Sequence, residues 1–212
     1  MSKFSLKTHF HNKIVKWSIK DTKMKRRTPI LILAISLLLL FGDRGYNIAS
    51  AYVDYKTLSI PVHEQEMKNW CWAASAQMVI DYFGGNKSQR QIVNYVKGSV
   101  IDKPGSNNET IKALNYGGVE GTHKNGKLTF GSIISQINNN QPILAAVNYY
   151  RSKDNVGHMF VIRGYYEDNS DDSYDVYFID PADGTRNYRN YDSFADNSVY
   201  YWDRSIHRIY VN

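Results

Sequence analysis

The spacing of hydrophobic residues divides the chain from residue 52 onward into a helical half and a strand half. In the first half, apolar side chains recur every three or four residues, which is the period of a helix with one buried face. Each run stops at Gly or Asn residues, which favour the end of a helix. The pattern predicts helices over residues 71–83, 88–98, 109–116 and 130–137.

From residue 143 the apolar residues alternate with polar ones or form short runs, a pattern typical of strands. It predicts strands over residues 143–149, 158–166 and 174–179, and one or two more over 199–210. We expect the acidic segment 168–172 to be a hairpin loop and residues 58–62 to be extended. Because helices come first and strands follow, the predicted fold class is α+β, with N-terminal helices packed against a C-terminal antiparallel sheet.

The N-terminal region contains an apolar run of twelve residues, 30–41. It is shorter than the about 20 residues of a membrane-spanning helix and suits the hydrophobic region of a signal peptide. Basic residues precede it, and Ala49-Ser50-Ala51 follows as a small-x-small cleavage site. We therefore expect residues 24–51 to be a signal peptide and residues 52–212 to be one secreted domain, beginning at Tyr52. An uncleaved membrane anchor is the alternative.

Residues 1–23 form an N-terminal lead of doubtful status, because a signal peptide counted from Met1 would be too long. Either translation starts at Met24, or the lead is an unusually long cytoplasmic segment. The net charge of +6 also belongs to this region, since residues 1–51 carry +8 and the remaining residues −2. The charge therefore gives no reason to expect nucleic-acid binding, and we expect membrane contact only through the export segment.

The sequence offers no recognisable binding motif for a metal or cofactor. A single cysteine excludes a disulfide scaffold and a cysteine-cluster zinc site. His63, His123 and His207 have no second ligand at metal-binding spacing, so we expect them to be surface or strand residues. The glycines form no phosphate-binding loop. We therefore expect no cofactor. We also expect the domain to be a monomer.

The single cysteine, Cys71, is a candidate nucleophile. It lies at the start of a predicted helix, where the helix dipole favours a thiolate. Gln65, six residues earlier, carries an amide that can donate to an oxyanion, and His158 opens a predicted strand where it can act as a base. Asp180, at the end of the next strand, can hold the far ring nitrogen of that histidine. The alternative is a buried thiol that packs as a small hydrophobic group.

Two segments resemble the active-site motifs of papain-like cysteine peptidases. Residues 65–73 carry a glutamine six residues before Cys-Trp-Ala, and residues 157–165 carry a histidine followed six and seven residues later by Gly-Tyr. Papain itself has an asparagine within Asn-Ser-Trp-Gly after the histidine strand, whereas this chain has Ile179-Asp180-Pro181. An aspartate before proline is more similar to the compact bacterial branches, which include bacteriocin-leader peptidases and papain-like effector peptidases.

The resemblance implies a papain-like fold with the active site between helices and sheet. It implies that Cys71 is the nucleophile, His158 the base and later the acid, and Asp180 the residue that orients His158. Gln65 and the main-chain N–H of Cys71 would form the oxyanion hole. Trp70, beside the nucleophile, is either a core residue or a wall of the substrate cleft, and we keep it as a candidate substrate-binding residue.

The sequence therefore predicts a secreted bacterial cysteine peptidase that hydrolyses peptide bonds in a protein or peptide substrate. Two alternatives stay open. The same residues could serve acyl transfer or the cleavage of amides in cell-wall peptides. The fold could also be a catalytically silent binding or adhesion domain.

Overall fold

The computed structural model of the chain describes residues 51–152 and 157–211. The predicted signal peptide up to residue 50 lies outside the described residues, so its cleavage stays a prediction. Within the described ranges, no helix combines the length and apolar character needed to cross a bilayer.

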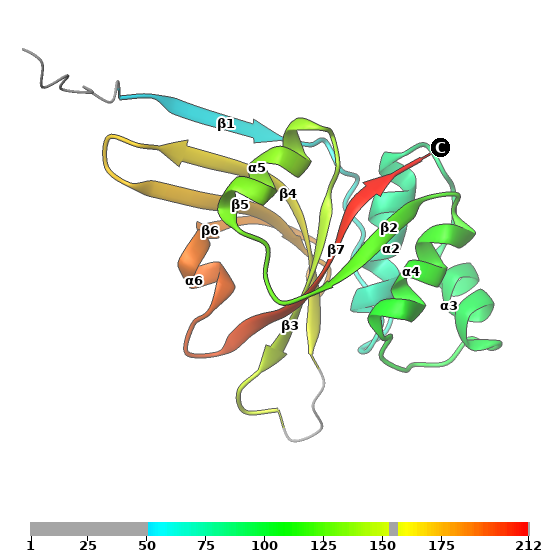
Figure 1. The fold of residues 1–212 in the computed structure, drawn as a ribbon. Helices are drawn as coiled ribbons and strands as arrows, with labels where there is room; N and C mark the ends of the chain where they lie inside the picture. Colours follow the sequence, from blue (N-terminus) through cyan, green and yellow to red (C-terminus); the bar gives the residue numbers. More distant parts are fainter. Residues whose placement is uncertain (1–50, 153–156, 212) are drawn as a thin grey trace, which may run out of the picture. The chain divides into compact units, whose positions relative to one another are not determined.

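Three helices form a group beside the sheet: α2 (Cys71–Tyr82), α3 (Gln89–Lys97) and α4 (Asn107–Tyr116). All three contact one another (Figure 1). Ser88 and Ser106 begin α3 and α4 with capping boxes, in which the serine side chain accepts from the third helical residue and that residue's side chain accepts in return. Helix α2 instead has Trp70 at its N-cap position, with no capping side-chain hydrogen bond among the described residues.

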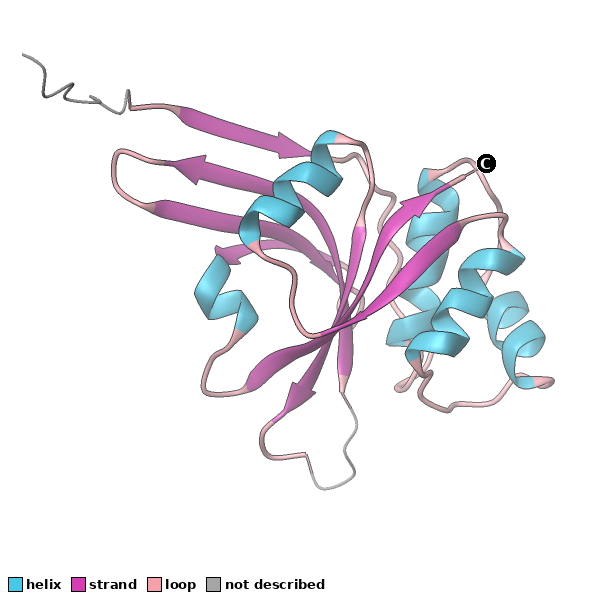
Figure 2. Ribbon diagram, viewed as in Figure 1, coloured by secondary structure: helices cyan, strands magenta, loops and turns pink. Residues whose placement is uncertain are grey.

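The strands of the described residues form one antiparallel sheet of seven, shown in magenta in Figure 2. The strand order is β2-β7-β3-β4-β5-β6, and β1 pairs with the far half of β4. The strands are β1 (Val53–Thr57), β2 (Glu120–Asn125), β3 (Ile143–Tyr149), β4 (His158–Asp168), β5 (Ser173–Asp180), β6 (Thr185–Asn190) and β7 (Tyr200–Tyr210). Two further helices pack on the sheet: α5 (Phe130–Asn138) on β4 and β1, and α6 (Tyr191–Ala195) on β5, β6 and β7.

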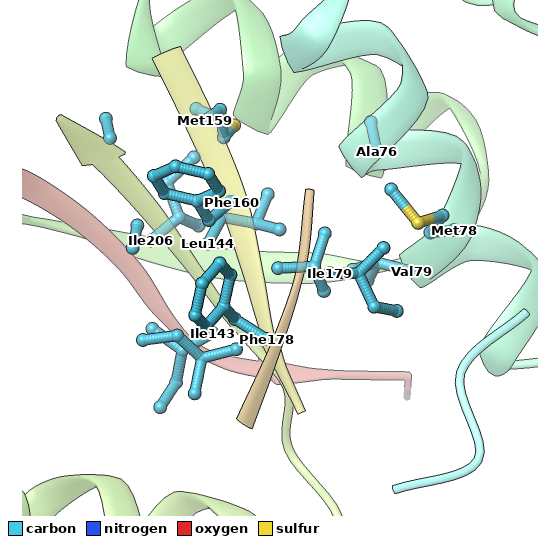
Figure 3. Packing of buried hydrophobic residues seen from close by; sticks show 14 of the residues in the cluster. Ala76, Met78, Val79, Ile143, Leu144, Met159, Phe160, Phe178, Ile179 and Ile206 are labelled. Carbon is cyan, nitrogen blue, oxygen red and sulfur yellow. The ribbon is translucent and has the colours of Figure 1, made fainter. Parts of the chain in front are cut away.

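The hydrophobic core lies between α2 and the sheet. Figure 3 shows Met78 and Val79 of α2 together with Ile179 of β5 and Phe160 of β4, all members of one buried cluster. Residues 143–147 of β3 are buried, as expected for a strand that is covered on both faces.

The α+β fold class is confirmed, and each of the four predicted helices lies within two residues of its expected bounds at either end. Three elements of the sheet were not predicted: β1, β2 and β6. The short helix α6 was also missed. Segment 58–62 directly follows β1 and belongs to no helix or strand. Residues 200–210 form a single strand.

Candidate active site

Cys71 is the first residue of α2 and a partly buried free thiol. The first-turn N–H groups of a helix have no partner within the helix and carry the positive end of its dipole. The short turn before α2 positions this end, since the N–H of Trp70 donates to the carbonyl of Met67 at 3.0 Å. The side chain of Cys71 is therefore held where main-chain N–H groups converge.

His158 lies between Cys71 and Asp180. Its Nε2 is 2.7 Å from Oδ1 of Asp180, and its ring also makes a hydrogen bond with the side chain of Cys71. Because Nε2 faces Asp180, Nδ1 is the nitrogen left for the thiol. Asp180 is fixed in turn, since its Oδ1 accepts from the main-chain N–H of Ala182 at 2.8 Å.

The electrostatics of this group favour an imidazolium. Burial lowers the pKa of His158, but the hydrogen bonds to Asp180 and Cys71 and their negative charges outweigh it and raise the pKa to about 9. Burial raises the pKa of Asp180, but the hydrogen bonds from His158 and Ala182 hold it below its ordinary value. The side chain of His158 is only 10% exposed, so solvent screens these interactions weakly.

Strand pairing and aromatic packing hold His158 in place. Val147 of β3 pairs with His158 across the sheet, and a side chain at Gly157 would collide with the carbonyl oxygen of Val147. The ring of Phe160 meets the imidazole edge to face, with 4.8 Å between centroids. Phe160 packs in turn against Phe178 at 5.2 Å. The imidazole ring is therefore held by packing against buried aromatic side chains.

Gln65 lies beside the Asp180 turn, because its main-chain N–H donates to the carbonyl of Pro181 at 2.7 Å. Its side-chain amide donates to the carbonyls of Met67 at 3.0 Å and Lys68 at 2.8 Å. Its Oε1 is buried and has no hydrogen-bond partner among the described residues. The structure thus brings Gln65 close to the turn that follows Asp180, but its side-chain amide points toward the carbonyls of Met67 and Lys68.

A cleft of about 370 Å³ opens from Cys71 and His158. The loop before α4 and the facing ends of β3 and β4 border it. Its lining residues are Cys71, Trp72, Pro104, Gly105, Ser106, Asn107, Glu109, Ala146, Val147, Gly157, His158, Met159 and Arg204.

Of the two tryptophans beside the nucleophile, Trp70 differs from its candidate role as a substrate-binding residue. Trp70 is fully buried, and its indole N–H donates to the carbonyl of Ile101 at 2.9 Å. Trp72 is almost as deeply buried but lines the cleft, and its indole N–H donates to the carbonyl of Lys103 at 3.1 Å. The side chain that borders the cleft is therefore that of Trp72, and Trp70 is a core residue.

One contact was not predicted from the sequence. His63 pairs with Asp81 of α2, with Nε2 and Oδ2 2.7 Å apart. The two residues are eighteen positions apart, so their spacing gives no signal. Across residues 51–152 and 157–211, no group of three His, Cys, Asp or Glu side chains lies close enough to hold a metal ion.

A cysteine at the head of a buried helix, with a histidine and an aspartate on adjacent antiparallel strands, defines the papain-like cysteine peptidases. A family model described as the Peptidase_C39 like family matches residues 57–207, and the chain belongs to this family. It is therefore a cysteine-type peptidase. The matched range contains Gln65, Cys71, His158 and Asp180.

Two solved structures with TM-scores above 0.5 share the fold. A putative C39-like peptidase from Bacillus anthracis superposes with a TM-score of 0.53 at 14% identity, over 73% of this chain and 97% of that chain. The peptidase domain of Streptococcus ComA, a bi-functional ABC transporter involved in quorum sensing, also gives 0.53 at 14% identity, over 71% and 98%. A double glycine motif protease from an AMS/PCAT transporter, solved with its leader peptide, gives 0.46 at 19% identity, over 71% and 93%. A search of curated proteins found no match to the sequence.

Proposed function

We propose that the chain is an exported cysteine peptidase in which Cys71, His158 and Asp180 carry out the hydrolysis of peptide bonds. The observation that carries the proposal is the position of His158, which bonds to Asp180 through one ring nitrogen and to Cys71 through the other. A pKa near 9 keeps the imidazole protonated at neutral pH, so that it can give a proton to the departing amine.

In the proposed reaction, Sγ of Cys71 forms a bond to the carbonyl carbon of the substrate, and the π electrons of the C=O bond move to oxygen. When this intermediate collapses, the C–N bond breaks and Nδ1 of His158 gives its proton to the departing amine. Water then attacks the thioester while His158 takes up a proton. The C–S bond breaks, and the acid product leaves with the thiolate restored.

We assign the oxyanion hole to the main-chain N–H of Cys71 and the amide of Gln65. The N–H of Cys71 lies at the open end of α2, where it needs no helical partner. The amide of Gln65 is bonded to Met67 and Lys68 in this structure, so it has to share or exchange one of these bonds when negative charge develops on the substrate oxygen. Such a donor acts in the transition state more than in substrate binding.

The proposal of export depends on the sequence of residues 24–51, a basic segment followed by an apolar run and Ala49-Ser50-Ala51. Expression in a bacterial host and N-terminal sequencing of the exported form tests it. A mature chain that begins at Tyr52 supports cleavage. A chain that keeps the apolar run makes the enzyme membrane-tethered.

The test of the activity is cleavage of a library of quenched fluorescent peptides by the chain from Tyr52 onward. We expect wild type to cleave a subset, and Cys71→Ala and His158→Ala to cleave none. His63→Ala is the matched control, because it also removes a histidine paired with an aspartate at 2.7 Å. Loss of cleavage in the control as well would attribute the effect to folding.

Labelling of Cys71 with iodoacetamide separates the alternatives. A hyper-reactive thiol with no peptide cleavage points to acyl transfer or to amide bonds outside ordinary peptides, which purified cell wall and added amines would then reveal. A thiol that reacts no faster than a free cysteine contradicts the proposed enzyme and favours a binding domain.

A further inference from the structure

Asn107 is a buried polar residue that lines the cleft, and the described part of the fold provides no hydrogen-bond acceptor for its side-chain N–H group. The residue is only 6% exposed and lines the cleft that contains Cys71 and His158. Its Nδ2 has no hydrogen-bond partner among the described residues. A buried donor without a partner destabilises the folded state, because it has lost its hydrogen bonds to water and gained none in return.

Helix α4 does not need this side chain. Asn107 is the first residue of the helix, but Ser106 caps it by accepting from the N–H of Glu109 at 3.3 Å. Glu109 completes the capping box by accepting from the N–H of Ser106 at 2.8 Å. Ser106 and Glu109 therefore cap the helix without the side chain of Asn107.

Glu109, the one carboxylate among the described residues that line the cleft, already has hydrogen-bond partners. Oε1 of Glu109 accepts from Lys97 at 2.7 Å, and its Oε2 accepts from Ser106. Much of the remaining wall consists of apolar side chains, including Trp72, Val147 and Met159. A peptide that enters such a cleft loses water from its main-chain carbonyl groups, and each of them then needs a donor.

The loop before α4, which leads into Asn107, is fixed by hydrogen bonds. Its carbonyls at Ile101, Lys103 and Pro104 accept, in turn, from the indole of Trp70 at 2.9 Å, the indole of Trp72 at 3.1 Å and the ammonium of Lys97 at 2.8 Å. Gly105 lies so close to the ring of Trp72 that a Cβ there would collide with it. Asn107 is thus positioned before a substrate arrives, which lowers the entropic cost of using it.

From these observations we infer that Asn107 is a substrate-binding residue of the peptidase, whose Nδ2 donates a hydrogen bond to a main-chain carbonyl oxygen of the peptide in the cleft. The inference rests on the proposed function. It adds a recognition contact that acts on binding and leaves the chemistry at Cys71 unchanged.

The test compares Asn107→Leu and Asn107→Asp with wild type. Both variants keep the size of the side chain and remove its donor. The control is Asn108→Leu, the same change at the adjacent exposed residue, which does not line the cleft. The substrate is the library peptide that wild type cleaves fastest, and the second probe is iodoacetamide, which reaches the thiol without filling the cleft.

We expect Asn107→Leu to raise KM about 3- to 10-fold with kcat changed less than about 2-fold, as for loss of one neutral hydrogen bond. Asn107→Asp should raise KM more, because a carboxylate oxygen would then face a carbonyl oxygen. Iodoacetamide should label all variants at the wild-type rate. Asn107→Leu should also be at least as resistant to urea as wild type, because it removes an unpaired buried donor.

Unchanged KM in both variants would overturn the inference, as would a loss of stability without a change in KM, which would mark a structural asparagine. Wild-type KM in Asn107→Asp together with a raised KM in Asn107→Leu would mean that the side chain accepts a hydrogen bond, which also overturns it. A wild-type chain that cleaves no peptide refutes the proposed function, and this inference with it. If wild type cleaves a peptide and the variants show an unchanged KM, the inference on Asn107 fails while the proposed function stands.

Discussion

The pH dependence of turnover tests the electrostatics of His158 directly. Its pKa of about 9 lies well above the ordinary value of 6.5, which favours the imidazolium by about 3 kcal/mol. The hydrogen bond that His158 donates to Asp180 is the first of the causes that raise it. Because the imidazolium must give a proton to the departing amine, turnover should fall as pH rises through about 9.

Asp180→Asn removes the negative charge and keeps a hydrogen-bond partner for the ring. Loss of one adjacent charge typically shifts a pKa by about 1–3 units, so the alkaline limb should move to lower pH by roughly that amount. Activity should remain measurable at neutral pH, since an amide can orient the histidine in Cys-His-Asn enzymes. Asp180→Ala, which leaves the ring unsupported, should lose more activity.

The assay is kcat/KM for one quenched peptide between about pH 5 and pH 10.5, with iodoacetamide labelling in parallel. Labelling should persist above the alkaline limb, because a thiolate remains reactive after the imidazolium loses its proton. The control is Asp183→Asn, whose carboxylate accepts from the N–H of Thr185 at 3.0 Å and not from His158. A wild-type limb below about pH 7.5, or a limb that does not move in Asp180→Asn, would refute the reasoning.

Four further outcomes follow from the same geometry. Cys71→Ala and His158→Ala should each abolish hydrolysis, and the double variant should be little worse than either, because the two residues act as a unit; additive losses would contradict this. Gln65→Ala should lower kcat by about 10²–10³-fold without changing iodoacetamide labelling, and a changed labelling profile would assign Gln65 another role. Gly105→Ala should lower kcat/KM and stability together, because its Cβ would collide with the ring of Trp72; urea denaturation and peptide turnover measure both effects. Because the pKa of His158 is raised in the folded state, its protonation should stabilise the fold fully below about pH 6.5, and this stabilisation should be lost as pH rises through about 9. Over that range the free energy of unfolding should fall by about 3 kcal/mol more in wild type than in His158→Gln. Equal slopes for the two proteins would contradict this expectation.

The buried elements were predictable from sequence because burial imposes a period. Helix α3 shows both signals, a capping box from Ser88 to Gln91 and a left-handed Gly98 at its end. Strand β3 is an unbroken apolar run, and it was found at its predicted bounds. In these segments the side chains themselves carry the information on the fold.

The missed strands carry little such information. Strands β2 and β6 are mostly exposed at the two edges of the sheet and are made of polar residues, and β1 places its exposed Val53 and Tyr55 on one face. Main-chain pairing with a neighbour holds them in place. A sequence pattern that reports burial cannot identify strands of this kind.

The arrangement around Cys71 was predictable in part. The order and type of Gln65, Cys71, His158 and Asp180 suggested a common site, and strand pairing brings the histidine and aspartate within 2.7 Å. The direction of the Gln65 amide depends on carbonyls of the turn before α2, which no spacing reveals. Trp70 precedes the helix, so helical periodicity did not tell which indole would face the cleft.

The position of Trp72 has a consequence for measurement. From residue 52 onward the sequence contains three tryptophans, and two of these, Trp70 and Trp202, are buried away from the cleft. Trp72 borders the cleft next to the thiol, with the ammonium of Lys97 5.5 Å from its ring. We expect a peptide that enters the cleft to change the polarity around Trp72, the one of these three indoles that lines it. The enzyme therefore carries its own fluorescent reporter, and binding to a Cys71→Ala variant can be followed by emission without any turnover.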